Sequence, residues 1–363
     1  MRLVTRPDFD GIVCGSLITA VEDIDDYLFV EPKFMQDRAV EIRKGDIIAN
    51  LPYNPSCTLW FDHHITNSGE WLSRVGVTED RGSIGKTEDR GSKIEDRASP
   101  PPPSSILYPP SSTISSSILD PQSSIVFGKG GFRLAPSAAR VVYEYYTSAA
   151  WIESSRSNPD AAKALELFRS PRFQFLLHET DRVDAGQLTP EDVLNPRGYV
   201  LISMTIDGKY EADGPYWRRL IEMLRDLPLE EVMADPEVKR RCQGILDAQE
   251  KLKAILLKRT TLKGNVIYVD LRGIKDVPDG NRFLLYTLFP AGNISMKIAE
   301  DPQRENTIAI SVGYNIFNPT SKVNVGALLE RHGGGGHKVV GSCRVPAAEA
   351  DRHIQEIFEA IKE

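Results

Sequence analysis

The sequence predicts an α/β protein: an N-terminal, doubly wound domain with a mostly parallel sheet, joined by a helical linker to a smaller C-terminal domain of mixed α/β structure. Three observations predict this fold. The chain opens with a short apolar strand, an acidic loop and an apolar helix, which is how a doubly wound domain begins. Strand-like and helix-like segments alternate again from residue 261 onward, after a long charged helix. The length of 363 residues gives room for about two domains.

The first strand and the first helix frame an acidic loop. Residues 3–5 form the predicted strand, and residues 12–21 have the small and apolar side chains of a buried helix. Asp8 and Asp10 lie two positions apart between them. Two such side chains in an extended loop point the same way, so both can bind one cation. The alternative is that Asp10 only caps the helix, a role that Asp fills well.

A later strand runs into one acid and two histidines. Residues 58–61 are apolar or β-branched and read as a buried strand, and Asp62, His63 and His64 follow directly. Because open α/β sheets bind ligands at the carboxyl ends of their strands, we expect these side chains at that edge. Carboxylate oxygen with imidazole nitrogen suits manganese, iron or zinc better than calcium. The alternative is that the histidines only cap the strand end and form local hydrogen bonds.

Two more strands are predicted between these, at residues 27–30 and 46–51. Asn50 stands where the second of them ends, and Asp46 stands where it begins. The rule that ligands bind at carboxyl ends of strands therefore favours Asn50 as a site residue.

Residues 77–127 differ in composition from the rest of the chain. The sequence Thr-Glu-Asp-Arg-Gly-Ser occurs at residues 78–83 and again at 87–92, and a tract rich in Pro, Ser and Ile follows. Such a segment offers too little apolar surface to offset the entropy lost on ordering. We expect a largely disordered insert, which costs little in loop closure; a docking tail is the alternative.

The remainder of the first domain is predicted to be helical. Its helices have apolar spacing at residues 135–147, 161–170, 173–180 and 213–226. Asp181 and Asp184 follow the third of these helices, with His178 just before them, and form another candidate ligand cluster. A solvated helix end is the alternative. We expect the catalytic domain at 1–230, the linker at 231–260 with a helix at 236–258, and the second domain at 261–363.

A run of four glycines marks the second domain. Predicted strands and helices alternate there, at 265–271, 281–288, 294–298, 307–314, 324–332, 342–345 and 347–362. Gly333–Gly336 precedes His337 and Lys338, and Arg344 is near in sequence. Glycines let backbone amides point into one concavity, so the run is typical of a phosphate-binding loop. The alternative is a helix C-cap followed by a flexible turn, for which one glycine is enough.

Composition narrows the classes of partner. The formal net charge is −7 and the pI about 5.6, which disfavours long duplex nucleic acid but allows a small anionic substrate. The four cysteines, Cys14, Cys57, Cys242 and Cys343, form no Cys-x-x-Cys pair, so we expect thiols in a reducing cytoplasm. The N-terminus has no signal-peptide pattern, and no apolar run is long enough to span a bilayer.

Taken together, these motifs resemble the DHH phosphoesterases that carry a DHH-associated C-terminal domain. The resemblance covers nearly the whole chain apart from residues 77–127. It depends on four features in order: Asp8-x-Asp10, then Asp62-His63-His64, then a downstream Asp, and then Gly-Gly-Gly-His near the C-terminus. The family includes exopolyphosphatases, oligoribonucleases that also cleave 3′-phosphoadenosine 5′-phosphate, cyclic-dinucleotide phosphodiesterases and RecJ-like exonucleases.

The resemblance implies roles for particular residues. The implied metal ligands are Asp8, Asp10, Asn50, Asp62, His63 and Asp181, with Asp184 as the alternative to Asp181. The implied catalytic residues are Asp62, His63 and His64. The implied substrate-binding residues are Gly334, Gly335, Gly336, His337 and Arg344. Two departures stand out, because many members have a His shortly before the first Asp and an Asp where this chain has Asn50.

The implied activity is metal-dependent hydrolysis of a phosphoanhydride or phosphodiester by two divalent cations, manganese with magnesium or cobalt as alternatives. An exopolyphosphatase-like enzyme is the first expectation, acting on a phosphorylated small molecule, polyphosphate or a short oligonucleotide in the cleft between the domains. The alternatives are an oligoribonuclease or 3′-phosphoadenosine 5′-phosphate phosphatase, and a cyclic-dinucleotide phosphodiesterase. A non-catalytic protein that binds a phosphorylated metabolite is the rival of another class. We expect a cytoplasmic protein without a membrane partner, and a homodimer is compatible with the sequence.

Overall fold

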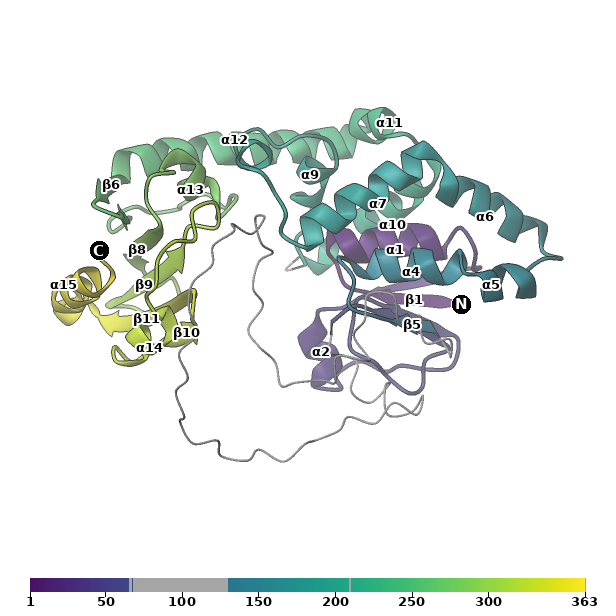
Figure 1. Cartoon of the computed structure of the whole chain (residues 1–363), viewed down its shortest axis with the longest axis horizontal. Helices are drawn as coiled ribbons and strands as arrows, with labels where there is room; N and C mark the ends of the chain where they lie inside the picture. Colours follow the sequence, from purple (N-terminus) through teal and green to yellow (C-terminus); the bar gives the residue numbers. More distant parts are fainter. Residues whose placement is uncertain (65–66, 68–129, 209, 363) are drawn as a thin grey trace, which may run out of the picture.

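The computed structural model describes residues 1–64, 67, 130–208 and 210–362. The predicted insert at 77–127 lies outside the described residues. Two sheets form the centres of the two halves of the molecule, and the long helix α12, Pro236–Arg259, runs along both (Figure 1). The predicted α/β class is confirmed by these two sheets and the helices that cover them.

The first sheet has five parallel strands in the order β2-β1-β3-β4-β5. Their bounds are Arg2–Thr5 for β1, Asp26–Phe29 for β2, Asp46–Ala49 for β3, Leu59–Asp62 for β4 and Gly130–Phe132 for β5. The order places the carboxyl ends of β1, β3, β4 and β5 side by side along one edge. The loops that leave these four strands therefore lie next to one another.

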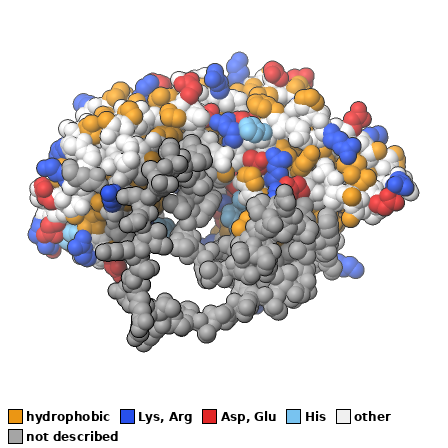
Figure 2. Space-filling view, viewed as in Figure 1, with side chains coloured by type: hydrophobic (Ala, Val, Ile, Leu, Met, Phe, Trp, Pro, Cys, Tyr) orange, Lys and Arg blue, Asp and Glu red, His pale blue; other side chains and the backbone are white. Residues whose placement is uncertain are grey.

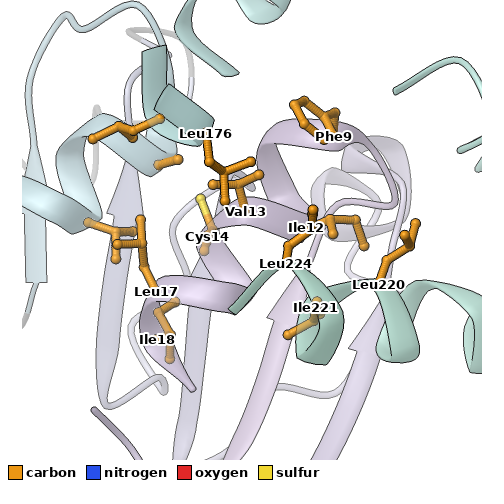
Figure 3. Close-up of a cluster of buried hydrophobic side chains, with 14 of the residues drawn as sticks. Phe9, Ile12, Val13, Cys14, Leu17, Ile18, Leu176, Leu220, Ile221 and Leu224 are labelled. Atoms are coloured by element: carbon orange, nitrogen blue, oxygen red, sulfur yellow. The ribbon is translucent and has the colours of Figure 1, made fainter. Parts of the chain in front are cut away.

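Alternating side chains bury both faces of this sheet. Leu3, Ile47 and Phe61 face one hydrophobic core, whereas their neighbours Val4 and Ile48 face a second, smaller core. The larger core surrounds α1, Phe9–Ile18, and every residue of this helix is buried (Figure 3). A helix that is apolar on all sides needs neighbours on all sides, and α1 packs between the sheet and the helices α4, α7 and α10.

The helices of this half follow in sequence. Their bounds are Pro32–Gln36 (α2), Ala138–Tyr146 (α4), Ala149–Ser154 (α5), Pro159–Arg169 (α6), Pro171–Asp184 (α7), Pro190–Leu194 (α8), Gly198–Ser203 (α9), Gly214–Asp226 (α10) and Leu229–Ala234 (α11), with the 3-10 turn Glu211–Asp213 (η1). Ser137 caps α4, because its hydroxyl accepts a hydrogen bond from the Arg140 amide. The cap places the N-terminus of α4 just after β5.

The linker helix α12 contacts both cores. Asp235 caps its N-terminus and Pro236 occupies its first turn, which is where proline fits a helix. Val238 and Cys242 near its start belong to the core around α1, whereas Leu252 near its end packs in a cluster with the second sheet. Among the described residues, no helix combines the length and apolar character needed to cross a bilayer.

The second sheet has six strands in the order β10-β11-β9-β8-β7-β6, and only β7 and β8 are parallel. Its strands are Thr260–Lys263 (β6), Val266–Asp270 (β7), Ile294–Glu300 (β8), Thr307–Tyr314 (β9), Gly335–His337 (β10) and Val340–Pro346 (β11). Its helices are Leu284–Leu288 (α13), Val325–Glu330 (α14) and Ala350–Ile361 (α15), with the 3-10 turn Ala347–Glu349 (η2). Side chains of β8, β9 and β11 form one core with α14 and α15. Figure 1 shows these two helices on the side of the sheet away from the first half.

Several elements differ from the sequence prediction. The first helix begins at Phe9, three residues earlier than predicted, and Asp8 rather than Asp10 is its N-cap. The third predicted helix extends to Asp184, so the acids expected after it lie within α7. The glycine run, predicted to be a loop, contributes the edge strand β10. Glycine has low intrinsic preference for strands, which is why pattern reasoning missed it.

Candidate metal centre and active site

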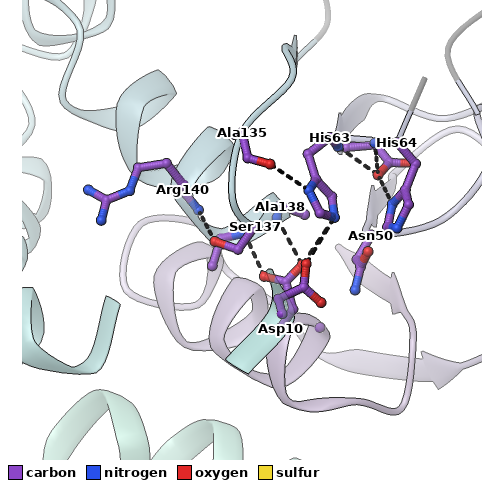
Figure 4. Close-up of polar contacts among 12 residues, drawn as sticks. Asp10, Asn50, His63, His64, Ala135, Ser137, Ala138 and Arg140 are labelled. Carbon is purple, nitrogen blue, oxygen red and sulfur yellow. Dashed lines mark hydrogen bonds and ion pairs between the residues drawn. The ribbon is translucent and has the colours of Figure 1, made fainter. Parts of the chain in front are cut away.

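The carboxyl ends of β1, β3, β4 and β5 bring polar groups from distant parts of the chain together (Figure 4). Asp8 and Asp10 follow β1, Asn50 follows β3, and His63 follows β4. Asp184 joins them from the C-terminal end of α7. The placement agrees with the expectation that side chains at strand ends share one edge.

Asp10 is held by the N-terminus of α4. Its carboxylate accepts hydrogen bonds from the amides of Ala138 and Ala139, both at 2.8 Å, and its side chain is buried. These amides are unpaired within the helix and carry the positive end of its dipole, so they stabilise a buried carboxylate. Burial nevertheless raises the pKa of Asp10, while His63 acts in the opposite direction. The two amides thus fix the carboxylate in position, but they do not fully compensate its negative charge.

His63 presents an unshared nitrogen to two carboxylates. Its Nδ1 lies 2.9 Å from the carbonyl oxygen of Ala135, which can only accept, so Nδ1 carries the proton. Nε2 is buried and has no hydrogen-bond partner among the described residues. It lies 3.2 Å from Asp184 Oδ2 and 3.9 Å from Asp10 Oδ2. Three electron-pair donors facing one point are the arrangement that a divalent cation satisfies.

Asp8 lies beside this group with a different set of neighbours. Asn50 Nδ2 donates to both of its carboxylate oxygens, at 3.1 and 3.3 Å, and Arg6 Nε lies 3.1 Å from Oδ2. Asn50 itself has a left-handed backbone with φ of 57°, which Asn tolerates better than most residues. Its Oδ1 is buried and has no hydrogen-bond partner among the described residues. An orphaned acceptor beside a carboxylate is a further possible ligand atom.

Asp62 forms hydrogen bonds within the turn that follows β4. Its Oδ1 accepts from the amides of His63 and His64, at 2.7 and 3.1 Å, and its Oδ2 accepts from Asn67 Nδ2 at 2.7 Å. The same Oδ1 lies 2.9 Å from His64 Nδ1. The oxygens of Asp62 thus form the turn after β4 and orient His64. The reason is local, since an Asp side chain readily accepts from the next two amides. Asp62, His63 and His64 also offer ligand atoms within 4.8 Å of one another, so Asp62 stays a predicted metal ligand.

Asp181 and Asp184 lie three residues apart on α7 and have different partners. Asp181 accepts from Ser137 Oγ at 2.6 Å and forms an ion pair with Arg140. Asp184 approaches His63 instead. The structure therefore favours the alternative ligand, Asp184, over Asp181, because Asp184 groups with Asp10 and His63. Arg140 already neutralises Asp181, whereas the carboxylate of Asp184 points at an imidazole nitrogen that a cation can share. Which of the two acids binds a metal stays a prediction.

Burial and mutual repulsion raise the pKa values of these acids. The pKa of Asp8 is raised to about 6, chiefly by burial; Arg6 opposes the rise and the charge of Asp10 adds to it. Burial also raises the pKa of Asp184, and the charges of Asp10 and Asp8 add to the rise. Burial lowers the pKa of His64, but the hydrogen bond and the charge of Asp62 outweigh it, so that its pKa is raised overall. Clustered like charges of this kind are typical of a functional site.

The glycine run forms the edge of the second sheet. A Cβ on Gly334 would lie 2.2 Å from Ser342 O, and one on Gly336 would lie 2.3 Å from Val340 O. Packing against β11 therefore explains these two glycines. A Cβ on Gly335 would meet nothing within 4 Å, and its φ is not positive. Gly335 is thus the member of the run for which the fold gives no reason, and it borders open space.

The other predicted substrate-binding residues lie on the same hairpin. His337 pairs with Val340 across β10 and β11 and is exposed. Arg344, on β11, donates from Nε to Asp301 Oδ2 at 2.6 Å, and its side chain is about half exposed. Arg344 is therefore held by an acid rather than aimed freely at a ligand.

Comparison with known proteins gives one strong likeness. No protein-family model matches the sequence, and no curated protein matches it. The solved structure of PggH, a pGpG-specific phosphodiesterase from Vibrio cholerae, matches 99% of this chain and 98% of its own with 27% identity and a TM-score of 0.71. The family resemblance read from the motifs is confirmed by this match. The chain is a DHH-family phosphoesterase.

Two RecJ structures also match, more weakly. RecJ from Thermus thermophilus in complex with Mn2+ is 14% identical over 99% of this chain and 51% of its own, with a TM-score of 0.43. A RecJ exonuclease bound to manganese is 14% identical over 98% and 88%, with the same TM-score. A likeness at this level carries no weight, and the family assignment rests on the whole-chain match and the motifs.

Sequence reasoning missed several groups that form the centre of this DHH phosphoesterase. The backbone of residues 135–139 supplies both the carbonyl that orients His63 and the amides that hold Asp10. Arg6 lies shortly before Asp8, in the segment where many family members have a His, and it forms an ion pair with Asp8. Ser137 is a recognisable helix cap in the sequence, and that signal could have placed a helix N-terminus beside the centre.

Proposed function

We propose that this DHH phosphoesterase hydrolyses the phosphodiester bond of a short, linear dinucleotide that carries a terminal phosphate, such as pGpG. The observation that supports this choice is the likeness to a pGpG-specific phosphodiesterase over almost the full length of both chains. This likeness favours a dinucleotide as substrate over polyphosphate. No particular residue of the chain indicates polyphosphate. Long nucleic acids are disfavoured by the net charge of −7. Figure 2 agrees, since basic and acidic side chains alternate over the described part of the face in view.

The residues fit a divalent metal. His63 Nε2, Asp10 and Asp184 would hold one ion, and Asp8 with Asn50 Oδ1 would contribute to a second, weaker position because Arg6 already offsets part of the charge of Asp8. Manganese is our first choice, with magnesium or cobalt as alternatives, because hard oxygen and imidazole nitrogen suit these ions. When bound, such ions make water acidic enough to supply hydroxide and neutralise charge on the phosphoryl oxygens.

His64 is placed to manage a proton. Asp62 fixes its ring through Nδ1 and raises its pKa, so that a larger fraction is protonated at neutral pH. Its side chain is 40% exposed, whereas that of Asp62 is fully buried, so the imidazole is the member of the pair that a substrate can reach. We assign His64 as the group that donates a proton to the departing oxygen of the nucleotide.

The open face of the second sheet is suited to the terminal phosphate. Gly335, Ser342, Ser311 and Lys297 are in register across β10, β11, β9 and β8, on the face opposite α14 and α15. A row of small and hydroxyl-bearing residues with one lysine lets an anion approach the backbone closely. At Lys297 the row meets a cavity of about 970 Å³, also lined by Arg282. Its size fits the range for nucleotide-sized ligands.

The proposal is tested by the rates at which the manganese-loaded protein cleaves different substrates. We expect pGpG to be converted to mononucleotides faster than cyclic dinucleotides, 3′-phosphoadenosine 5′-phosphate or polyphosphate. His63→Ala is the control that should abolish all turnover. Faster release of phosphate from polyphosphate than cleavage of any dinucleotide would contradict the proposal.

The rival function, a non-catalytic binding protein, is motivated by Asn50 where the family usually has Asp and by the missing His shortly before Asp8. The same experiment separates the two. An enzyme cleaves pGpG only with metal, whereas a binding protein shifts its melting temperature with pGpG and leaves the dinucleotide intact.

A further inference from the structure

A second group of metal-binding side chains lies in the other half of the molecule. His332 lies just beyond Arg331, the C-cap of α14, and His353 and Glu356 stand three residues apart on α15. The Nδ1 atoms of the two histidines are 2.8 Å apart, and Glu356 Oε2 lies 3.9 Å from His332 Nδ1. Figure 1 shows α14 and α15 away from α1 and α7, which carry the catalytic acids. The group is therefore separate from the metal centre described above.

The geometry is close to that of a tetrahedral ion. Ligand atoms about 2.0–2.1 Å from zinc lie roughly 3.4 Å from one another. Ligand separations of 2.8 and 3.9 Å bracket this value, so modest side-chain rotations complete the site. The side chains of His332 and His353 are 8% and 15% exposed, and that of Glu356 is 49% exposed. Two nearly buried imidazoles with one open side leave room for entry and for a water as fourth ligand.

Charged neighbours contact these side chains. Arg352 lies 3.0 Å from Glu349 and 3.5 Å from Glu356, and its Nη2 lies 3.2 Å from His353 Nε2. Nε2 therefore accepts, and the His353 proton lies on Nδ1 toward His332. When Nδ1 of His353 binds an ion, its proton has to move to Nε2. Glu349 Oε2, which lies 3.8 Å from Nε2, can then accept a hydrogen bond from Nε2. A carboxylate behind a ligating histidine is the usual support of a metal site.

One cationic side chain competes with an ion for this site. This side chain, Arg352, is 60% exposed and is free to turn into solvent when an ion takes its place.

We propose that His332, His353 and Glu356 form a zinc site that fastens the end of α14 to α15. Imidazole nitrogen with one carboxylate favours zinc over magnesium or manganese. The ion fixes the residue that precedes the glycine run, because His332 is followed directly by Gly333. The proposal is independent of the substrate assigned to the catalytic centre.

The test is the zinc content of the full chain. Purified protein is dialysed against micromolar Zn2+, and zinc per chain is measured by elemental analysis for the wild type, His353→Gln and the control His178→Gln. The sequence placed His178 beside a candidate ligand cluster, but in the structure it is an exposed histidine of α7. It belongs to none of the ligand groups that the described part of the chain brings together. We expect His353→Gln to hold one zinc fewer per chain, with zinc content unchanged in His178→Gln and manganese-dependent turnover unchanged in both. Equal zinc in all three proteins would overturn the proposal.

Two exposed substitutions keep the test decisive if His353→Gln fails to fold. Glu356→Gln removes a ligand charge and should weaken zinc binding about tenfold or more, on the scale seen for supporting residues of metal sites. Arg352→Gln removes the competing cation and should tighten it. If the two histidines only form a hydrogen bond with each other, neither substitution should change the zinc affinity. Unchanged zinc affinity in both variants would therefore refute the site.

Discussion

At the scale of single residues, the direction of an acid decides its role. Asp181 and Asp184 are both on α7, yet one is neutralised by Arg140 and the other faces His63 and Asp10. An acid that repels its neighbours destabilises the metal-free protein and gains a role only when a cation is bound. The pair therefore provides a matched comparison.

We expect Asp184→Asn and Asp181→Asn to have opposite effects. Asp184→Asn should lower manganese affinity about tenfold or more and turnover about a hundredfold or more, while raising the stability of the metal-free protein, since like-charge repulsion is relieved. Asp181→Asn should keep the metal but lose about 1–3 kcal/mol of stability, since Arg140 loses its charged partner. Metal content, kcat and urea unfolding measure the three quantities. Loss of metal in Asp181→Asn with retention in Asp184→Asn would reverse the assignment.

At the scale of elements, the edge strand β10 shows two uses of glycine. Gly334 and Gly336 allow β10 to lie against β11, and Gly326 of α14 allows the helix to approach the strand, since a Cβ there would be 2.5 Å from Gly336 O. Gly335 has no such constraint. The strand thus combines positions required by packing with one that we assign to the substrate.

Substitution of neighbouring glycines should separate these uses. Gly335→Val should change the free energy of unfolding by less than about 1 kcal/mol but raise KM, because the added side chain occupies space reserved for the phosphate. Gly334→Ala should cost about 2–4 kcal/mol through its clash with Ser342 O. Urea unfolding and steady-state kinetics on pGpG test both, and an unchanged KM in a folded Gly335→Val would remove this residue from the substrate site.

Much of the element order and the position of the site could be predicted from the sequence. The alternation of apolar side chains in β1, β3 and β4 and the strand ending in Asp62 were sufficient to place the site at the carboxyl edge. The choice between Asp181 and Asp184 could not be made, because it depends on how α7 packs against Arg140 of α4. The hydrogen bonds from the amides of His63 and His64 to Asp62 could not be predicted either, because a sequence motif does not show backbone geometry. Strand β10 was missed because it is three residues long and glycine-rich.

At the scale of the whole molecule, the buried acids couple stability to pH and metal. The folded-state pKa of Asp8 is about 6 against 3.8 in the unfolded chain, and that of Asp184 is also raised. Between pH 3.8 and about pH 6, the folded protein therefore holds a proton on Asp8 that the unfolded chain has lost. The free energy of unfolding falls as the pH rises through this range. Acids with lowered pKa, such as Asp213 and Asp270, change their contribution only below about pH 4.

We predict that chelator-treated protein is less stable at pH 7 than at pH 5, by about 1–3 kcal/mol. Manganese should remove this loss of stability, because the bound ion neutralises the acids in place of protons. The stability gained on adding manganese should therefore increase from pH 5 to pH 7. Thermal or urea unfolding with and without manganese measures the difference. Asp184→Asn should flatten the metal-free profile, and a metal-free wild type that gains stability over this range would contradict the charge arrangement described.

The ligands of the centre come from two lengths of backbone. Asp10 and His63 precede residue 68, whereas Asp184 and the groups that hold Asp10 and His63 follow residue 129. Strand β5 returns to pair directly with β4, so the two lengths meet again beside the same edge. A bound ion would therefore link the two segments at this edge of the sheet. Neither of these two segments carries all of the candidate ligands by itself.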